Sequence, residues 1–182
     1  MVKQWMMAAA CSAAGLAIPT QATEIYANLG LNYHNVSFDT GNAQADADDD
    51  SDAGYHLGFG VRRPFGEHQQ HWFGFRVDFD EVLGDSMVGF RAIDYQYQLD
   101  DHWRLGAFFG AASLDTGASQ TGYYLGGGAT YLNIYPQLDV GLDVRYGDRL
   151  ARDVLFADDP ETDSPDIFYD VLSTSLYLSW RF

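Results

Sequence analysis

Hydrophobic and polar residues alternate along most of this chain. From Trp72 to Asp80, phenylalanines and a valine take every second position, with glycine, arginine and aspartate between them. From Gln137 to Gly147, leucines, valines and a tyrosine alternate in the same way with glycine, aspartate and arginine. A period of two residues is typical of β-strands. Beyond residue 22 there is no apolar run near 18 residues and no clear helical period, so the pattern predicts an all-β chain.

We count eight alternating segments of about ten residues or more. They run over residues 24–38, 54–63, 72–80, 86–99, 103–114, 122–135, 137–147 and 167–182. Within 86–99 the alternation changes phase near Arg91, which predicts a β-bulge. The facing of 122–135, which contains Gly126-Gly127-Gly128, stays open. Connections after the second, fourth and sixth segments are short, whereas those after the first, third, fifth and seventh are more polar or longer.

The residues on the polar face distinguish a membrane barrel from a soluble β-sandwich, which also alternates. Here that face carries glycine, serine, arginine and aspartate, with almost no lysine or glutamate, which suits a narrow, hydrogen-bonded lumen. We interpret these charges as a structural network, with polar conduction as the alternative. The predicted lumen residues are Arg76, Asp78, Asp94, Arg104, Asp139, Asp143 and Arg145.

Aromatic residues gather at both ends of the predicted strands, as they do at the two interfaces of a bilayer. One rim would hold Trp72, Trp103, Trp180, Phe65, Tyr97, Tyr135 and Phe182, and the other Tyr33, Tyr55, Phe79, Tyr123 and Tyr146. Together with the alternating connections, these belts predict an eight-stranded antiparallel up-and-down transmembrane β-barrel with both termini on the periplasmic side.

The first 22 residues are expected to be a separate segment. Lys3 precedes an apolar stretch from Trp5 to Ile18, and the following Pro19-Thr20-Gln21-Ala22 ends in a small residue, with Thr20 acceptable two positions earlier. This arrangement predicts a Sec-type signal peptide over 1–22 and a barrel domain over 23–182. A membrane anchor is the alternative, but about 14 apolar residues are too few to span a bilayer as a helix. A lipoprotein box ending at Cys11 is a weaker alternative.

The charge balance narrows the partners. The chain has 26 acidic residues against 10 Lys and Arg, a net charge of −16, and its single lysine lies in the predicted signal peptide. This acidity argues against nucleic acid as a partner. Cys11 is the one cysteine, so the mature chain would hold neither a disulfide nor a thiol nucleophile. The mean hydropathy of −0.22 argues against a helical membrane protein and is compatible with a barrel.

The last segment alternates strictly from Leu172 and ends in an aromatic residue. Its Leu176, Leu178, Trp180 and Phe182 resemble the C-terminal assembly signal of bacterial outer-membrane proteins. The whole mature chain resembles the OmpA/OmpX-like group of eight-stranded outer-membrane barrels. The resemblance implies Sec-dependent export, insertion by the barrel-assembly machinery, and a bacterial outer-membrane location among lipid and lipopolysaccharide. It implies no catalytic residue, and we expect a monomer without a cofactor.

Three further sites are candidates. The acidic stretch with Asp46, Asp48, Asp49, Asp50 and Asp52 could bind divalent cations weakly and bridge them to lipopolysaccharide phosphates. A flexible, solvated acidic loop is the alternative. A nucleophile and base could come from Ser37 and His34, but residues three apart point to opposite faces of a strand. His68 and His71 could bind a metal weakly, although an exposed turn is the simpler interpretation.

The sequence therefore predicts a non-enzymatic outer-membrane barrel with an envelope-structural or surface-interaction role through acidic extracellular loops. The first alternative is a narrow channel for small or apolar solutes. The second is a lipid A-modifying barrel enzyme.

Overall fold

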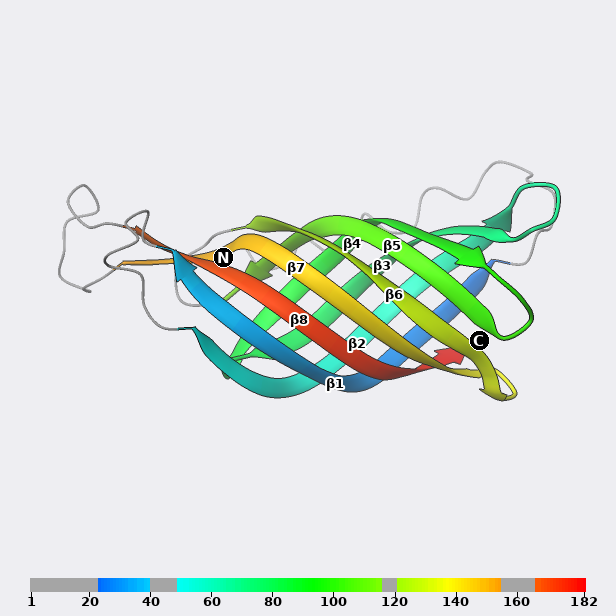
Figure 1. Cartoon of the computed structure of the whole chain (residues 1–182), viewed down its shortest axis with the longest axis horizontal. Coiled ribbons are helices and arrows are strands. Elements are labelled where there is room, and N and C mark those ends of the chain that lie inside the picture. Colours follow the sequence, from blue (N-terminus) through cyan, green and yellow to red (C-terminus); the bar gives the residue numbers. More distant parts are fainter. Residues whose placement is uncertain (1–22, 40–48, 116–120, 155–165) are drawn as a thin grey trace, which may run out of the picture.

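The computed structural model describes residues 23–39, 49–115, 121–154 and 166–182. Its eight strands form one closed antiparallel barrel in which neighbours in sequence are neighbours in space and β8 pairs with β1 (Figure 1). The strands are β1 (Glu24–Asp39), β2 (Asp50–Phe65), β3 (His71–Val82), β4 (Asp85–Gln98), β5 (Trp103–Leu114), β6 (Gly122–Tyr135), β7 (Leu138–Val154) and β8 (Asp166–Arg181). The predicted all-β, eight-stranded up-and-down barrel is confirmed. Among the described residues, no helix is long and apolar enough to cross a membrane.

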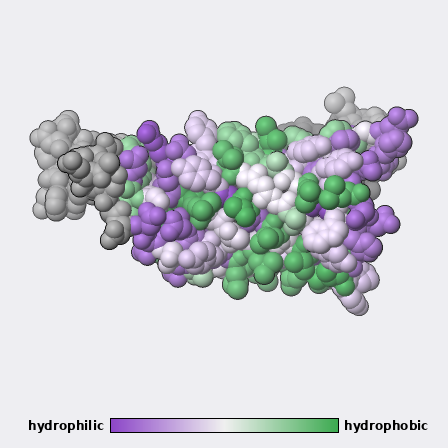
Figure 2. Space-filling model, viewed as in Figure 1, coloured by the Kyte–Doolittle hydropathy of each residue, from purple (hydrophilic) through white to green (hydrophobic). Residues whose placement is uncertain are grey.

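The outer face of the barrel is apolar. Leucine, phenylalanine, tyrosine and tryptophan side chains lie on this face. Among the exposed ones, the least exposed is Phe73, at 36%, and the most exposed is Phe182, at 75%. Figure 2 shows the hydrophobic residues gathered around the middle of the barrel, with hydrophilic residues toward both ends. A water-soluble protein would bury these side chains, so the surface is that of a barrel surrounded by lipid.

The last strand closes the barrel, so no strand edge is left unpaired. Leu176 pairs with Leu31 of β1 and with Leu142 of β7, and the N–H of Phe182 donates to the carbonyl of Ile25 at 2.9 Å. The side chains of the predicted assembly signal all point outward: Leu176, Leu178, Trp180 and Phe182. The strict alternation of the terminal segment thus places one apolar stripe against the membrane.

The structure shows where the alternation shifts in β4 and which side chains of β6 point into the lumen. The register shifts between Arg91 and Ile93 where β4 pairs with β5, which confirms the bulge near Arg91. In β6, Tyr124 and Thr130 point inward, so the glycines of the same parity, Gly126 and Gly128, line the lumen. A Cβ at Gly126 would meet the ring of Phe108, and a Cβ at Gly128 would meet the carboxylate of Asp143. These glycines leave room for side chains from neighbouring strands.

The structure refines one expectation and corrects another. The connection after the third strand, expected to be more polar or longer, is the tight turn Leu83-Gly84, with φ of 52° and 85°. Positive φ at both positions matches the right-handed twist of a hairpin. Trp72 lies at the predicted end of the barrel but points inward, unlike Trp103 and Trp180, because it shares the parity of Arg76. Its ring centroid lies 4.2 Å from the guanidinium carbon of Arg104, a cation–π contact.

Candidate functional site

The middle of the lumen holds a compact set of buried charges, here called the central cluster: Arg76, Asp78, Asp80, Arg91, Asp143 and Arg145. The Asp78 carboxylate accepts from Arg76 Nε at 2.6 Å and from Arg91 Nε at 2.9 Å. The Asp143 carboxylate accepts from the Nη2 atoms of the same two arginines, at 2.9 Å and 2.7 Å. Arg145 Nη2 donates to Asp80 at 2.9 Å. Three carboxylates therefore balance three guanidinium groups.

These bonds cross the barrel. Arg76 lies on β3 and Asp143 on β7, four strands apart in a ring of eight, so their bond spans the lumen. Tyr177 of β8 adds to the crossing, since its hydroxyl lies 3.3 Å from Arg76 Nη1 and 3.2 Å from Asp143 Oδ1. His56 Nδ1 lies 2.6 Å from Asp80 Oδ1 and extends the cluster toward β2. An eight-stranded barrel is just wide enough for side chains, and here they bridge its full width.

A second set of charged residues lies toward the end of the barrel that contains the C-terminus. It is called the lower cluster and consists of Glu24, Arg62, Asp94, Arg104, Asp139 and Arg181. Arg62 forms an ion pair with Glu24, and Arg181 Nε lies 3.1 Å from Asp139 Oδ2. Asp94 differs, because it accepts from the Tyr26 hydroxyl and from Gln96, each at 3.2 Å. Within the described part of the chain, no arginine lies within ion-pair distance of Asp94. Three carboxylates again face three guanidinium groups.

The structure thus brings all seven predicted lumen residues inside the barrel, each at most 6% exposed. Sequence reasoning missed five charged members of the two clusters: Glu24, Arg62, Asp80, Arg91 and Arg181. Asp80 could have been included, since it shares the parity of Arg76 and Asp78. Arg91 was obscured by the bulge, which reverses the alternation beside it.

Beyond the central cluster, toward the end of the barrel opposite the C-terminus, the lumen becomes apolar. This apolar cap is a cluster of buried side chains: Val36, Val82, Met87, Phe108, Ala112, Leu114, Tyr124, Leu150, Ala151 and Val171. Phe38, Leu83 and Tyr169 pack against it. His34 secures the β3–β4 turn beside the cap, because its Nε2 accepts from the N–H of Leu83 at 3.0 Å. The interior therefore contains charged side chains that bond across the lumen and, beyond them, a layer of apolar side chains.

Among the described residues, the other predicted sites are not assembled. Asp46 and Asp48 lie outside the described residues, while Asp49, Asp50 and Asp52 are exposed. The carboxylates of Asp50 and Asp52 accept from the next backbone N–H, at 2.8 Å and 2.7 Å. Across the described ranges, no group of three or more His, Cys, Asp or Glu side chains is placed to hold a metal ion.

The candidate nucleophile and base do not meet. His34 is buried in the lumen, whereas Ser37 has the opposite parity on β1. In the β2–β3 region, His71 Nδ1 lies 2.7 Å from the hydroxyl of Tyr95, and its ring packs near Phe65. His68 is exposed in the turn.

A closed barrel with an apolar exterior and a charged, crossed interior matches known membrane proteins. Neisserial surface protein A is 14% identical, with a TM-score of 0.50 over 88% of this chain and 99% of that one. The fold is that of the small eight-stranded outer-membrane barrels. This confirms the resemblance to the OmpA/OmpX-like group. Because the identity is low, the likeness shows the fold alone.

Two other solved structures have lower scores. The outer-membrane protein AlkL is 14% identical over 92% of this chain and 94% of that one, with a TM-score of 0.49. Ail, the attachment invasion locus protein of Yersinia pestis, is 13% identical over 87% and 99%, with a TM-score of 0.45. No protein-family model matches the chain, and no curated protein matches it at a significant level.

Proposed function

We propose that this chain is a non-enzymatic protein of the bacterial outer membrane, exported by a Sec-type signal peptide over 1–22 and inserted by the barrel-assembly machinery. Its role lies at the cell surface, in envelope structure or surface interaction, and is carried by the acidic end of the barrel. The observation that carries this proposal is how the charges are divided between the lumen and the ends.

The two charged clusters in the lumen are neutral, and the excess acidic charge lies elsewhere. The two clusters use six carboxylates and six arginines, and subtracting them leaves 20 acidic residues against four Lys and Arg in the whole chain. At the end opposite the chain's C-terminus, the carboxylates whose side chains are described include Asp39, Asp49, Asp50, Asp52, Glu81, Asp85, Asp115, Asp148 and Asp170. That end faces outward in a barrel whose short turns and termini lie on the periplasmic side. The strong negative field therefore belongs to the outer surface.

The crossed lumen supports a surface role over a channel. The bonds of Arg76 and Arg91 to Asp143 span the barrel, and the apolar cap lies above them. A polar solute would have to break buried, charge-assisted bonds and then pass a layer that cannot hydrate it. We expect planar bilayers containing the refolded protein to show no steady conductance, and a reproducible single-channel step would favour the channel alternative.

Clustered carboxylates at the outer end suit cationic partners. Divalent cations that bridge to lipopolysaccharide phosphates are the sharpest form of this interaction, since they need several oxygen ligands. Isothermal titration of the refolded barrel with millimolar Ca²⁺ tests this form directly. The absence of any heat would rule out the Ca²⁺ bridge to lipopolysaccharide. Direct binding of cationic groups to the acidic end is tested by polylysine.

A matched pair of triple variants tests the surface role on intact cells. Asp49, Asp50 and Asp52, each changed to Asn, neutralise three exposed carboxylates at the acidic end. Glu67→Gln with Asp100→Asn and Asp101→Asn neutralises three exposed carboxylates at the other end. Heat-modifiable mobility is measured for both variants, because Asp100→Asn also weakens the hydrogen bonds of a turn. We expect binding of fluorescent polylysine to fall in the first variant only. Equal binding by both variants and the wild type would contradict the proposal.

The absence of enzyme activity is tested separately. The mass spectrum of lipid A should stay unchanged when the protein is overexpressed, and new acylated or deacylated species would show an enzyme. Heat-modifiable mobility in gels tests the membrane-inserted barrel itself, because a folded barrel migrates differently before and after boiling.

A further inference from the structure

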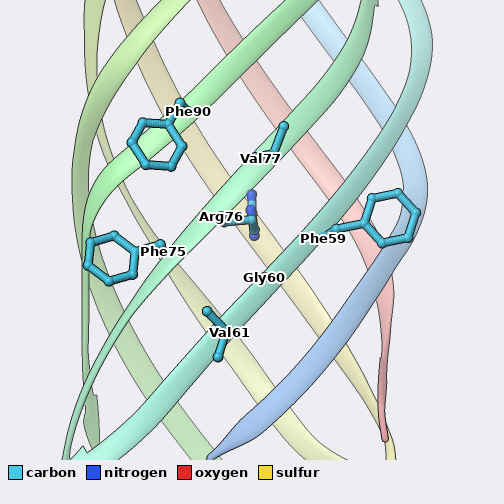
Figure 3. Close-up of a pocket in the computed structure, with 7 residues that line it drawn as sticks. All are labelled: Phe59, Gly60, Val61, Phe75, Arg76, Val77 and Phe90. Carbon is cyan, nitrogen blue, oxygen red and sulfur yellow. The ribbon is translucent and has the colours of Figure 1, made fainter. Parts of the chain in front are cut away.

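The outer surface of the barrel has a hollow over β2, β3 and β4. It has a volume of about 300 Å³ and is lined by the side chains of Phe59, Val61, Phe75, Val77 and Phe90. Figure 3 shows the rings of Phe59 and Phe75 on opposite sides of the hollow, with the smaller side chains between them. The hollow therefore lies within the apolar face of the barrel.

The sequence explains this hollow. Val77 pairs with Phe59 of β2 and with Phe90 of β4, and Phe75 precedes it by two residues on the same face. A short side chain surrounded by three rings leaves a depression, because the rings stand higher than the valine. The rings of Phe75 and Phe90 are nearly parallel, with centroids 6.5 Å apart, and define one wall.

A second, smaller hollow continues the first along β2 and β3. It measures about 100 Å³ and shares Val61 and Phe75 with the first. Its other lining residues include Phe73, Thr23 and Arg63. The two hollows form one lipid-facing groove that runs from mid-barrel toward the end where β1 begins, and it finishes at a cation.

Arg63 is an unusual residue for this face. Its side chain is exposed, and its parity on β2 is that of Phe59 and Val61, so it points outward. Among the residues the structure describes, no carboxylate lies within ion-pair distance of Arg63. In a strongly acidic chain, an arginine without a carboxylate at the end of an apolar groove indicates an anionic ligand with an apolar tail.

We propose that this groove binds one diacylphospholipid of the periplasmic leaflet, with an acyl chain against Val77 and the phosphate on Arg63. The proposal rests on the proposed outer-membrane location. Guanidinium groups pair strongly with phosphate oxygens, and basic side chains beside a membrane attract anionic headgroups. Signal cleavage after Ala22, which the sequence predicts, would place the α-amino group of Thr23 at the same end of the groove and add a second positive charge.

Native mass spectrometry of the refolded barrel in detergent, titrated with phosphatidylglycerol, tests the site. Val77→Phe fills the hollow, and Val144→Phe makes the same change on β7, where Val144 is also lipid-facing at 47% exposure. Arg63→Gln removes the positive charge that would bind the phosphate and does not alter the hollow. Arg149→Gln removes an exposed arginine at the other end of the barrel. We expect affinity for the first bound lipid to fall about threefold in each groove variant and to stay unchanged in each control.

The possible outcomes distinguish a specific lipid site in the groove from the membrane barrel as such. Equal affinity in all five proteins, or an equal loss in groove variants and controls, would mean nonspecific lipid around the belt and would overturn the proposal. Unchanged affinity in Arg63→Gln alone overturns it too, even if Val77→Phe fails to fold. Heat-modifiable mobility is measured for each protein, so failure of the groove is distinguished from failure of the membrane barrel.

Discussion

Removing the charge of Asp143 is the most direct test of the crossed lumen. Asp143 is 6% exposed, and its Oδ2 accepts from Arg91 Nη2 at 2.7 Å and from Arg76 Nη2 at 2.9 Å. Asp143→Asn keeps the shape but leaves three guanidinium groups against two carboxylates in the central cluster. Breaking a buried pair costs about 3–5 kcal/mol. Since Asp78 still binds both arginines, we expect the lower end, about 3 kcal/mol.

The assay is unfolding in urea from lipid vesicles, in which the free energy of unfolding is extrapolated from the denaturant midpoint and slope. Asp94→Asn is the matched control, because Asp94 is equally buried but accepts from the neutral Tyr26 and Gln96. Hydrogen bonds to a charged group contribute about 1.5–3 kcal/mol, so the control should lose less, about 1.5 kcal/mol. If Asp94→Asn lowers the free energy of unfolding as much as Asp143→Asn, the crossing does not stabilise the barrel as argued.

Three other outcomes are expected. Leu114→Ala in the apolar cap should lower the free energy of unfolding by about 3 kcal/mol in the same urea assay, since Leu114 is 2% exposed. Gly128→Ala should abolish heat-modifiable mobility, because a Cβ there would lie 2.6 Å from the carbonyl oxygen of Leu142, whereas Gly127→Ala should fold, its nearest obstacle being a carbonyl oxygen at 3.1 Å. Backbone N–H groups two and three residues further along hold the pKa of the Asp100 carboxyl below its usual value. Their stabilising effect exists above the unfolded pKa and disappears as the pH falls through the folded one, so Asp100→Asn should destabilise the barrel at pH 7 and make progressively less difference as the pH falls through the folded pKa.

The sequence predicted the strands well because one physical pattern, alternation with period two, fixes which face each residue occupies. In β3, and in β7 as far as Gly147, this pattern runs without interruption, and the inward placement of Asp78 and Asp143 follows from it. The same rule would have placed Trp72 inside. Its residue type suggested an aromatic girdle, although its parity matched that of the lumen residues.

Partners across the lumen could not be predicted in this way. Arg76 and Asp143 are 67 residues apart, and alternation gives the face of each residue but not its height along the barrel. Height depends on the register of every strand pair between them. Bulges change that register, at Arg91 in β4 and between Gly147 and Ala151 in β7, and nothing in the alternation gives the size of each shift.

The distribution of lumen charge among strands has a consequence for assembly. Inward charges on β3 leave one carboxylate in excess, since Arg76 faces Asp78 and Asp80, while β4 supplies the compensating Arg91. β3 alone is therefore charged, and part of its compensation comes from across the lumen, since Asp80 pairs with Arg145 of β7 and Asp143 of β7 accepts from Arg91. An open sheet in the membrane would hold unpaired charges in a medium where each is costly. Closure of the barrel brings the partners of β3, β4 and β7 together, so the ion pairs that cross the lumen favour the closed barrel over an open sheet.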